Sequence, residues 1–309
     1  LYAHTNKGWI SLLNGDYDTA EEEFYSALDL ARQDNFDISD AYVYGYMGTL
    51  YNRLEKYPKS IHYLEKALEI YLKYNDKRAI ASQLHNLGHV LNESGKSTEA
   101  LDCFKRSLVI KEEFEDINLL ASSYNQIADA YYMKGDYSLA IEHANRSIGY
   151  YNILGNRLFC AYSMIILADS LTQIGYFSES EVQLNLAQEV LEEFNNLFLL
   201  GKVDVLRGIK YFNEGDIEQS IYFYEEGMEK MQLGDAKRRI LNYSMELLHV
   251  LVYGKDFSRS SKYLKRSQLL LKKMVDVGPD KTLLDTIESY IAISTDGKEH
   301  EKIDSYQPE

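Results

Sequence analysis

Two histidines, His85 and His89, stand four residues apart, a spacing that places both imidazole rings on one face of a helix. Such a pair can chelate zinc, but the sequence supplies neither the glutamate of an H-E-x-x-H motif nor a third strong ligand beside it. We therefore expect no metal and no cofactor, and interpret both rings as part of a binding surface. A zinc site is the alternative.

Two carboxylates, Asp129 and Asp169, stand at equivalent positions of neighbouring repeat units. They could be read as an acid/base pair, but such catalysis needs a closed pocket, and the open groove expected below offers none. Holding the ammonium group of a ligand is the favoured role. The sequence also has no glycine-rich phosphate loop and no serine or cysteine nucleophile constellation, so we do not expect an enzyme.

The elements that carry these residues follow from a repeat of 40 residues. Small residues recur at this interval, with Leu248 as the one exception: Gly8, Gly48, Gly88, Ala128, Ala168 and Gly208. A second small series runs Ala20, Ser60, Ala100, Ala140, Ser180, Ser220 and Ser260, and an aromatic or apolar residue precedes most of its members by three positions. Helices approach closely only where side chains are small, so each unit is predicted to pair two helices, A and B.

A glycine between the two small positions predicts the turn that joins helix A to helix B, as in Asn14-Gly15-Asp16 and Lys134-Gly135-Asp136. The pattern is clearest from Ala81 to Ser107, where Asn86-Leu87-Gly88, Gly95, Ala100 and Phe104 resemble the tetratricopeptide repeat. The usual unit has 34 residues and a proline near its end; here the proline is absent and about six residues are added. The fold class expected is all-α, a right-handed superhelical solenoid of tetratricopeptide-type hairpins.

The predicted organisation is a solenoid over residues 1–295, with a disordered tail over 296–309. Its seven repeats start at residues 1, 41, 81, 121, 161, 201 and 241. A capping helix at about 281–294 would cover the last repeat with Leu283, Leu284, Ile287, Tyr290 and Ile291. Because Leu1 opens inside a helix without a cap, we expect the polypeptide to begin within a longer gene product.

Stacked hairpins of this kind wind so that the A helices form an inner wall, and positions 2, 5, 9 and 12 of each unit project from one face. Asparagines there offer a donor and an acceptor together, which suits the backbone of an extended peptide. A solvated polar surface is the alternative. The candidate peptide-binding residues are Asn52, His85, His89, Asn92, Ser122, Asn125, Asp129, Tyr132, Tyr162, Asp169, Lys202 and Asn242.

The charge balance excludes one class of partner. The net charge is −15, and residues 1–200 hold 16 Lys and Arg against 29 Asp and Glu. A nucleic-acid backbone would be repelled by this part of the chain. No secretory leader or membrane-spanning run is visible, so the expected compartment is the cytosol. Cys103 and Cys160 stand far apart and are expected to be buried and reduced.

The repeat texture, the long helices and the acidic, tyrosine-rich composition together resemble the Rap/Rgg/NprR/PlcR/PrgX group of quorum-sensing receptors, most of all the NprR type. This resemblance implies a cytosolic, homo-oligomeric receptor whose concave wall binds a short extended signalling peptide through asparagines, at Asn52, Asn92, Asn125 and Asn242. It also implies that DNA is bound only through a helix-turn-helix domain that this sequence does not show. The chain would then be a sensor that changes conformation or oligomeric state.

Two alternatives remain at this point. A Rap-like regulator would bind or dephosphorylate a response regulator, and a generic scaffold would hold protein tails, although only Lys202 suits a terminal carboxylate. For the peptide receptor, the charge pattern suggests an orientation in which the ligand ammonium faces Asp129 and Asp169 and its carboxylate faces Lys202.

Overall fold

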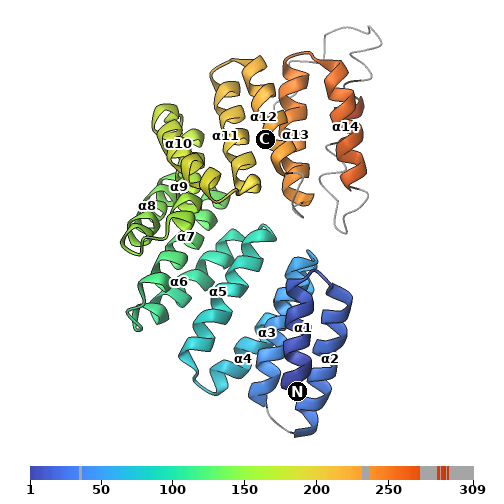
Figure 1. The fold of residues 1–309 in the computed structure, drawn as a ribbon, viewed down its shortest axis with the longest axis vertical. Coiled ribbons are helices and arrows are strands. Elements are labelled where there is room, and N and C mark those ends of the chain that lie inside the picture. Colours follow the sequence, from blue (N-terminus) through green and yellow to red (C-terminus); the bar gives the residue numbers. More distant parts are fainter. Residues whose placement is uncertain (35–36, 232–236, 272–283, 286, 290, 292–309) are drawn as a thin grey trace. The chain divides into compact units, whose positions relative to one another are not determined.

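The structure, a computed structural model, describes residues 1–34, 37–231 and 237–271, together with 284–285, 287–289 and 291. These residues fold into helices joined by short turns (Figure 1). The helices are α1 (Tyr2–Leu13), α2 (Tyr17–Asp34), α3 (Asp37–Arg53), α4 (Tyr57–Lys73), α5 (Lys77–Glu93), α6 (Ser97–Glu112), α7 (Ile117–Lys134), α8 (Tyr137–Ile153), α9 (Arg157–Gln173), α10 (Phe177–Glu193), α11 (Leu197–Asn213), α12 (Ile217–Met231), α13 (Lys237–Tyr253) and α14 (Phe257–Leu271).

The odd-numbered helices are the predicted A helices and the even-numbered helices are the predicted B helices. From α3 on, each A helix begins about four residues before the predicted start of its repeat, as Lys77 and Ile117 show. The all-helical hairpin fold class is confirmed. The predicted repeat and domain boundaries, and the number of repeats, stay predictions.

The turns within a hairpin and the turns between hairpins both contain a residue with positive φ. Gly135 follows α7 in the left-handed conformation, with φ 85°, and ends the helix as the sequence predicted. Glu55 and Lys255 adopt the same conformation where their repeats lack this glycine. The turns from helix B to the next helix A also contain a positive φ, which the sequence reading missed, at Asn75, Glu115, Gly155 and Asn195.

Side-chain caps begin four of the A helices. The Asp76 carboxylate accepts a hydrogen bond from the backbone N–H of Ala79 at 3.0 Å, and Asp116 accepts from Leu119 at 3.3 Å. Asn156 and Asn196 cap α9 and α11 in the same way. Each cap satisfies a backbone donor that the first turn of a helix leaves without an intrahelical partner.

Several hairpins within the units cross where the sequence placed their small residues. An alanine Cβ built at Gly88 of α5 would lie 2.7 Å from Cε1 of Phe104 on α6, and one at Gly8 would lie 2.6 Å from Phe24. These aromatic rings occupy the space that the missing side chains leave. In the hairpin of α7 and α8 the same positions hold two alanines, Ala128 and Ala144, both fully buried.

Serines at the crossings bond to the backbone of the partner helix. Ser60 Oγ donates to the Gly48 carbonyl at 2.7 Å, and Ser220 Oγ donates to Gly208 at 2.8 Å. At the other end of the hairpins, Ser107 and Ser147 donate to the carbonyls of Ala81 and Ala121, at 2.7 and 2.8 Å. Each of these buried hydroxyls thus donates to a backbone carbonyl of the partner helix.

The chain divides into two compact units, unit 1 (Leu1–Ile174) and unit 2 (Gly175–Glu309). The core of unit 1 includes Phe24, Met47, Tyr51, Leu84 and Phe104, all buried. The core of unit 2 is built from apolar residues of α11 to α14, with the buried side chains of Leu284, Ile287 and Ile291 packed among them.

Within unit 1, neighbouring odd-numbered helices touch one another: α1 with α3, α3 with α5, α5 with α7, and α7 with α9. Among the described helices, no two even-numbered ones come into comparable contact. The row of hairpins in unit 1 therefore curves toward its odd-numbered helices. We call the surface that α1, α3, α5, α7 and α9 form on this side the inner face.

Some predictions fall where the structure describes little or nothing. In the predicted capping helix, Leu283 and Tyr290 lie outside the described residues, and so does the whole predicted tail, 296–309. The two cysteines are free and buried, as predicted. Among the helices that the structure describes, none is long and apolar enough to cross a membrane.

Candidate functional site

Ten of the twelve candidate residues lie in unit 1, on α3, α5, α7 and α9. Lys202 on α11 and Asn242 on α13 lie in unit 2. The predicted ligand orientation that used Lys202 therefore stays a prediction. The site described below is the inner face of unit 1.

Asn92 and Asp129 connect two neighbouring A helices. The Asn92 Nδ2 group on α5 donates to Asp129 Oδ2 on α7 at 2.7 Å. Asn92 is only 4% exposed, and its Oδ1 atom accepts no hydrogen bond from the described residues. One half of the amide group thus positions a carboxylate on the inner face, while the other half is left without a donor.

Asn125 makes the corresponding link one repeat further on. Its Nδ2 group donates to Ser163 Oγ on α9 at 2.7 Å. Ser163 in turn lies 2.9 Å from the Ser147 hydroxyl on α8, which donates to the Ala121 carbonyl. A chain of hydrogen bonds therefore runs from the inner face into the hairpin and fixes the orientation of the Asn125 amide.

Asn52 and Gln83 also carry amide oxygens that are closed off from solvent and accept no hydrogen bond from described residues. The Gln83 amide occupies the space beside Gly45, where an added Cβ would meet its Nε2 atom at 3.0 Å. Leaving a buried acceptor without a donor costs about 1–3 kcal/mol. Asn52, Gln83 and Asn92 together give α3 and α5 three buried amide oxygens that lack a donor among the described residues.

The His85 ring accepts a hydrogen bond from a buried lysine of α6. The Lys111 ammonium at the end of α6 donates to Nδ1 of His85 at 3.2 Å and to Ser123 Oγ at 3.1 Å. Lys111 is 4% exposed, and burial lowers its pKa to about 8. Burial, with smaller contributions from Lys111 and His89, lowers the pKa of His85 to about 3, so the ring is neutral near pH 7.

His89 lies one turn further along α5, with Nδ1 3.6 Å from the Glu93 carboxylate. Its side chain is 40% exposed, so the pair contributes little to stability. Within the part of the chain that the structure describes, no three side chains of His, Cys, Asp or Glu are grouped to hold a metal ion.

The other candidates differ in how accessible they are. Ser122 donates to the Leu119 carbonyl of its own helix at 3.2 Å. Tyr132 packs against the core and against the ring of Tyr137, and the exposed Tyr162 ring stacks on Phe159. Asp169 is buried, which makes Asp129 the more accessible of the two predicted carboxylates.

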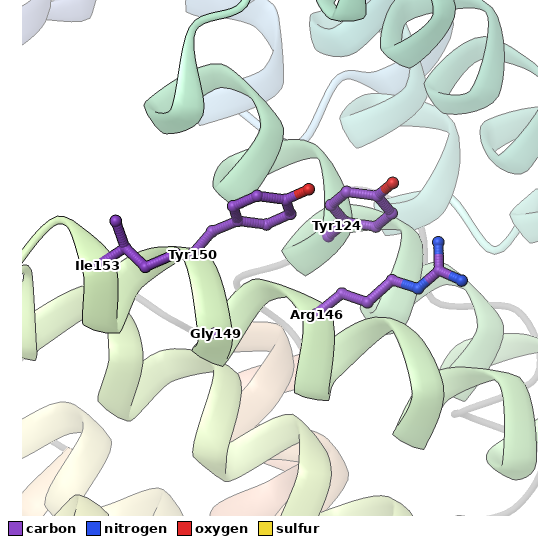
Figure 2. A pocket seen from close by; sticks show the side chains of 5 residues that line it. All are labelled: Tyr124, Arg146, Gly149, Tyr150 and Ile153. Carbon is purple, nitrogen blue, oxygen red and sulfur yellow. The ribbon is translucent and has the colours of Figure 1, made fainter.

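A separate pocket of about 360 Å³ lies along α7 and α8 (Figure 2). The rings of Tyr124 and Tyr150 stack there at 5.6 Å, and the Arg146 guanidinium lies 5.5 Å from the Tyr124 ring. Arg146 also pairs with Glu142 at 2.8 Å, so its charge is already matched. We assign this pocket to packing between the two helices.

Sequence reasoning missed Gln83 and Lys111. Lys111 had a readable signal, because the equivalent positions of other repeats hold the apolar or aromatic residues Ala31, Tyr71, Tyr151, Leu191 and Met231. A lysine in such a series is conspicuous. Gln83 had a weaker signal, since the equivalent positions of the next two repeats hold Ser123 and Ser163.

A sequence profile of the tetratricopeptide repeat matches residues 2–73 and 78–153. Over these two segments the chain is similar to the tetratricopeptide repeat. They include α1 to α8 and most of the candidate residues of the inner face.

Among curated proteins, the response regulator aspartate phosphatase E of Bacillus subtilis (strain 168) is similar to part of this chain. The two are 27% identical over 90 residues, which cover 29% of this chain and 24% of that protein. The aligned segment is therefore a minor part of that relative.

Solved structures, two of them of Rap proteins, share the fold over most of this chain. The apo form of RapI has a TM-score of 0.76 at 16% identity and covers 88% of this chain and 98% of its own. A Rap protein in complex with Competence and Sporulation Factor has a TM-score of 0.70 at 14% identity, covering 88% and 74%. Aspartyl phosphate phosphatase F from Bacillus subtilis has a TM-score of 0.68 at 14% identity, covering 87% and 69%.

The predicted resemblance to the tetratricopeptide domain of this receptor group is confirmed at the level of the fold. At these identities the likeness carries the fold and not the activity.

Proposed function

We propose that the inner face of unit 1 binds a short, extended signalling peptide, and that the chain is the sensor part of a cytosolic quorum-sensing regulator. The observation that carries this proposal is the set of amide oxygens of Asn52, Gln83 and Asn92, which lack donors on neighbouring A helices. An extended peptide presents N–H groups at regular intervals and would supply those donors once the amide side chains turn toward it.

The remaining candidates suit such a ligand. Asp129 lies on the same face, oriented by Asn92, and would hold a ligand ammonium group. Asn125 is fixed by Ser163 and would present its amide oxygen to the peptide backbone. The fold is also that of a Rap protein whose structure contains Competence and Sporulation Factor, which supports a peptide ligand for this chain.

Binding would change conformation by favouring one curvature of the row of hairpins. Each hairpin of unit 1 touches mainly its neighbours, so a ligand that contacts several of them stabilises the curvature that fits it best. We propose that contacts between copies of the chain shift with this curvature, which would link peptide binding to oligomeric state and, in a longer regulator, to transcription.

The test is a titration with short secreted peptides of the host, followed by calorimetry and sedimentation velocity. We expect one peptide to bind and to shift the sedimentation coefficient, and the double variant Asn52→Ala/Asn92→Ala to lose at least about tenfold in affinity. Asn145→Ala is the matched control, because Asn145 is an exposed asparagine of α8 that bonds within its own helix. Equal losses in both variants would remove the inner face from the proposal.

The second candidate function is that of a Rap-like regulator that binds or dephosphorylates a response regulator. It is favoured by the similarity to response regulator aspartate phosphatase E. Incubation of the chain with a phosphorylated response regulator separates the two. Accelerated loss of phosphate supports this second function, and an unchanged rate supports a sensor without phosphatase activity.

A further inference from the structure

Lys111 is a buried, positively charged side chain without an ion-pair partner among the described residues. Among the described residues no carboxylate forms an ion pair with it, and its two partners, His85 and Ser123, are neutral. A buried ammonium without an anion is costly. At the equivalent position of α12 the fold accepts Met231, fully buried, so packing alone does not require a lysine.

The geometry defines which ring nitrogen of His85 carries the proton. The ring is neutral near pH 7, and its Nδ1 atom accepts the hydrogen bond from Lys111. The single ring proton is therefore on Nε2, which donates to none of the described residues. The His85 ring is only partly buried on α5, so its Nε2–H is the donor that this residue can offer to a ligand.

We propose that the Lys111–His85 pair is a carboxylate-binding subsite of the inner face, in which Lys111 supplies the charge and His85 Nε2–H supplies the hydrogen bond. The pair carries one net positive charge and one free donor, which matches a singly charged carboxylate. The occupant is a carboxylate of the bound peptide, so the biological meaning of the subsite rests on the proposed function.

Among the described residues, few charged or titratable groups contact the pair. On α5 they are His85 itself and His89, which is paired with Glu93. On α7 the contacting group is the Ser123 hydroxyl, which carries no charge. An arriving carboxylate would thus be the first anion in contact with the pair, and it would stabilise the protonated form of Lys111.

The first experiment uses the full chain with ¹⁵N-labelled histidine and sodium acetate as the probe, at constant ionic strength. We expect a saturable shift of the His85 ring nitrogens that acetamide does not cause and that Lys111→Met abolishes. Lys105→Met, an exposed lysine on the same helix, is the control and should keep the response. No shift with acetate, or an equal shift in Lys111→Met, would overturn the subsite, provided circular dichroism shows that the variant is folded.

The second experiment separates this subsite from the proposed function. Two pools of acetylated, amidated pentapeptides are used, which differ only in whether one fixed position holds Asp or Asn. Each pool is titrated into the wild-type chain and into Lys111→Met. We expect the wild-type chain to prefer the Asp pool by about tenfold and Lys111→Met to show no preference. Pools that bind without preference refute the subsite but leave the peptide function standing. Acetate shifts without any pool binding support the subsite and refute the peptide function.

Discussion

The two polar atoms of the Asn92 amide group have different surroundings on the inner face. Its Nδ2 group holds Asp129, and its Oδ1 atom has no donor among the described residues. Because the two halves would serve a carboxylate and a peptide ligand separately in the proposed function, substituting the residue should affect both the fold and binding.

We expect Asn92→Ala to lower the free energy of unfolding by about 1–2 kcal/mol and peptide affinity by about tenfold, since it removes a hydrogen bond to a charged group and a ligand acceptor. Urea denaturation and calorimetry measure the two effects. Asn145→Ala should change neither. A loss of stability with unchanged affinity would make Asn92 a structural residue only.

Lys111 makes stability depend on alkaline pH. Its pKa falls from 10.5 to about 8 on folding, so between these values the unfolded chain binds more protons at this lysine, and the free energy of unfolding rises with pH. From pH 7 to 9.5 we expect a gain of about 2 kcal/mol in the wild type relative to Lys111→Met. Parallel urea melts at several pH values measure this difference.

The comparison with Lys111→Met is needed because other groups titrate in the same range. Burial raises the pKa values of the Cys103 and Cys160 thiols, which gives a slope of opposite sign in both chains. We also expect Lys111→Met to be the more stable chain at pH 7. If the two chains have identical pH slopes, the lysine does not occupy the buried environment described above.

At the scale of the helix pair, the hairpins are specified by matched sizes at the crossing. Gly88 faces Phe104, whereas Ala128 faces Ala144 in the next hairpin. A larger residue on one helix thus requires a smaller one on the other. This relation is visible in the sequence, which is why the hairpins and their turns were predictable.

We expect Gly88→Ala to cost about 1–3 kcal/mol through overpacking and Phe104→Ala about 3–5 kcal/mol. The double variant should cost at least about 1 kcal/mol less than the sum, because it reproduces the alanine pair of the next hairpin. A thermal-melt cycle measures this coupling. Gly149→Ala, where no atom lies within 4 Å of an added Cβ, is the control and should not destabilise the chain; additive costs would contradict the size-matching account.

Contacts between hairpins were less accessible from sequence. The positions of Asn92, Asn125 and Asp129 on one helical face followed from helical spacing. Asn92 bonds to Asp129, whereas Asn125 bonds to Ser163. These pairings depend on how far one A helix is shifted along the next, and no local sequence pattern encodes that shift. The positive φ at Asn75 and Glu115 was missed because neither residue is a glycine.

At the scale of the whole molecule, the chain consists of two compact units, Leu1–Ile174 and Gly175–Glu309. In repeat proteins stability is distributed over neighbouring interfaces, so separate regions can open independently. The sequence did not predict this division, because the 40-residue pattern continues through residue 174 without interruption.

We expect a mild core substitution to destabilise mainly the unit that contains it. Ile127→Val in unit 1, costing about 1 kcal/mol, should accelerate amide hydrogen exchange in α5 to α8 and leave α11 and α12 unchanged. Ile221→Val is the reciprocal control in unit 2. Exchange that accelerates equally in both units for either variant would show that the chain opens as one cooperative body.

The serine hydroxyls at the hairpin crossings explain how this architecture survives divergence. Ser60, Ser107, Ser147 and Ser220 each bond to a main-chain carbonyl, a group that every amino acid possesses. The residue that contributes the carbonyl can therefore mutate without breaking the bond, provided it stays small. Hairpins joined by such contacts can therefore exchange many of their other side chains while the helices keep their spacing.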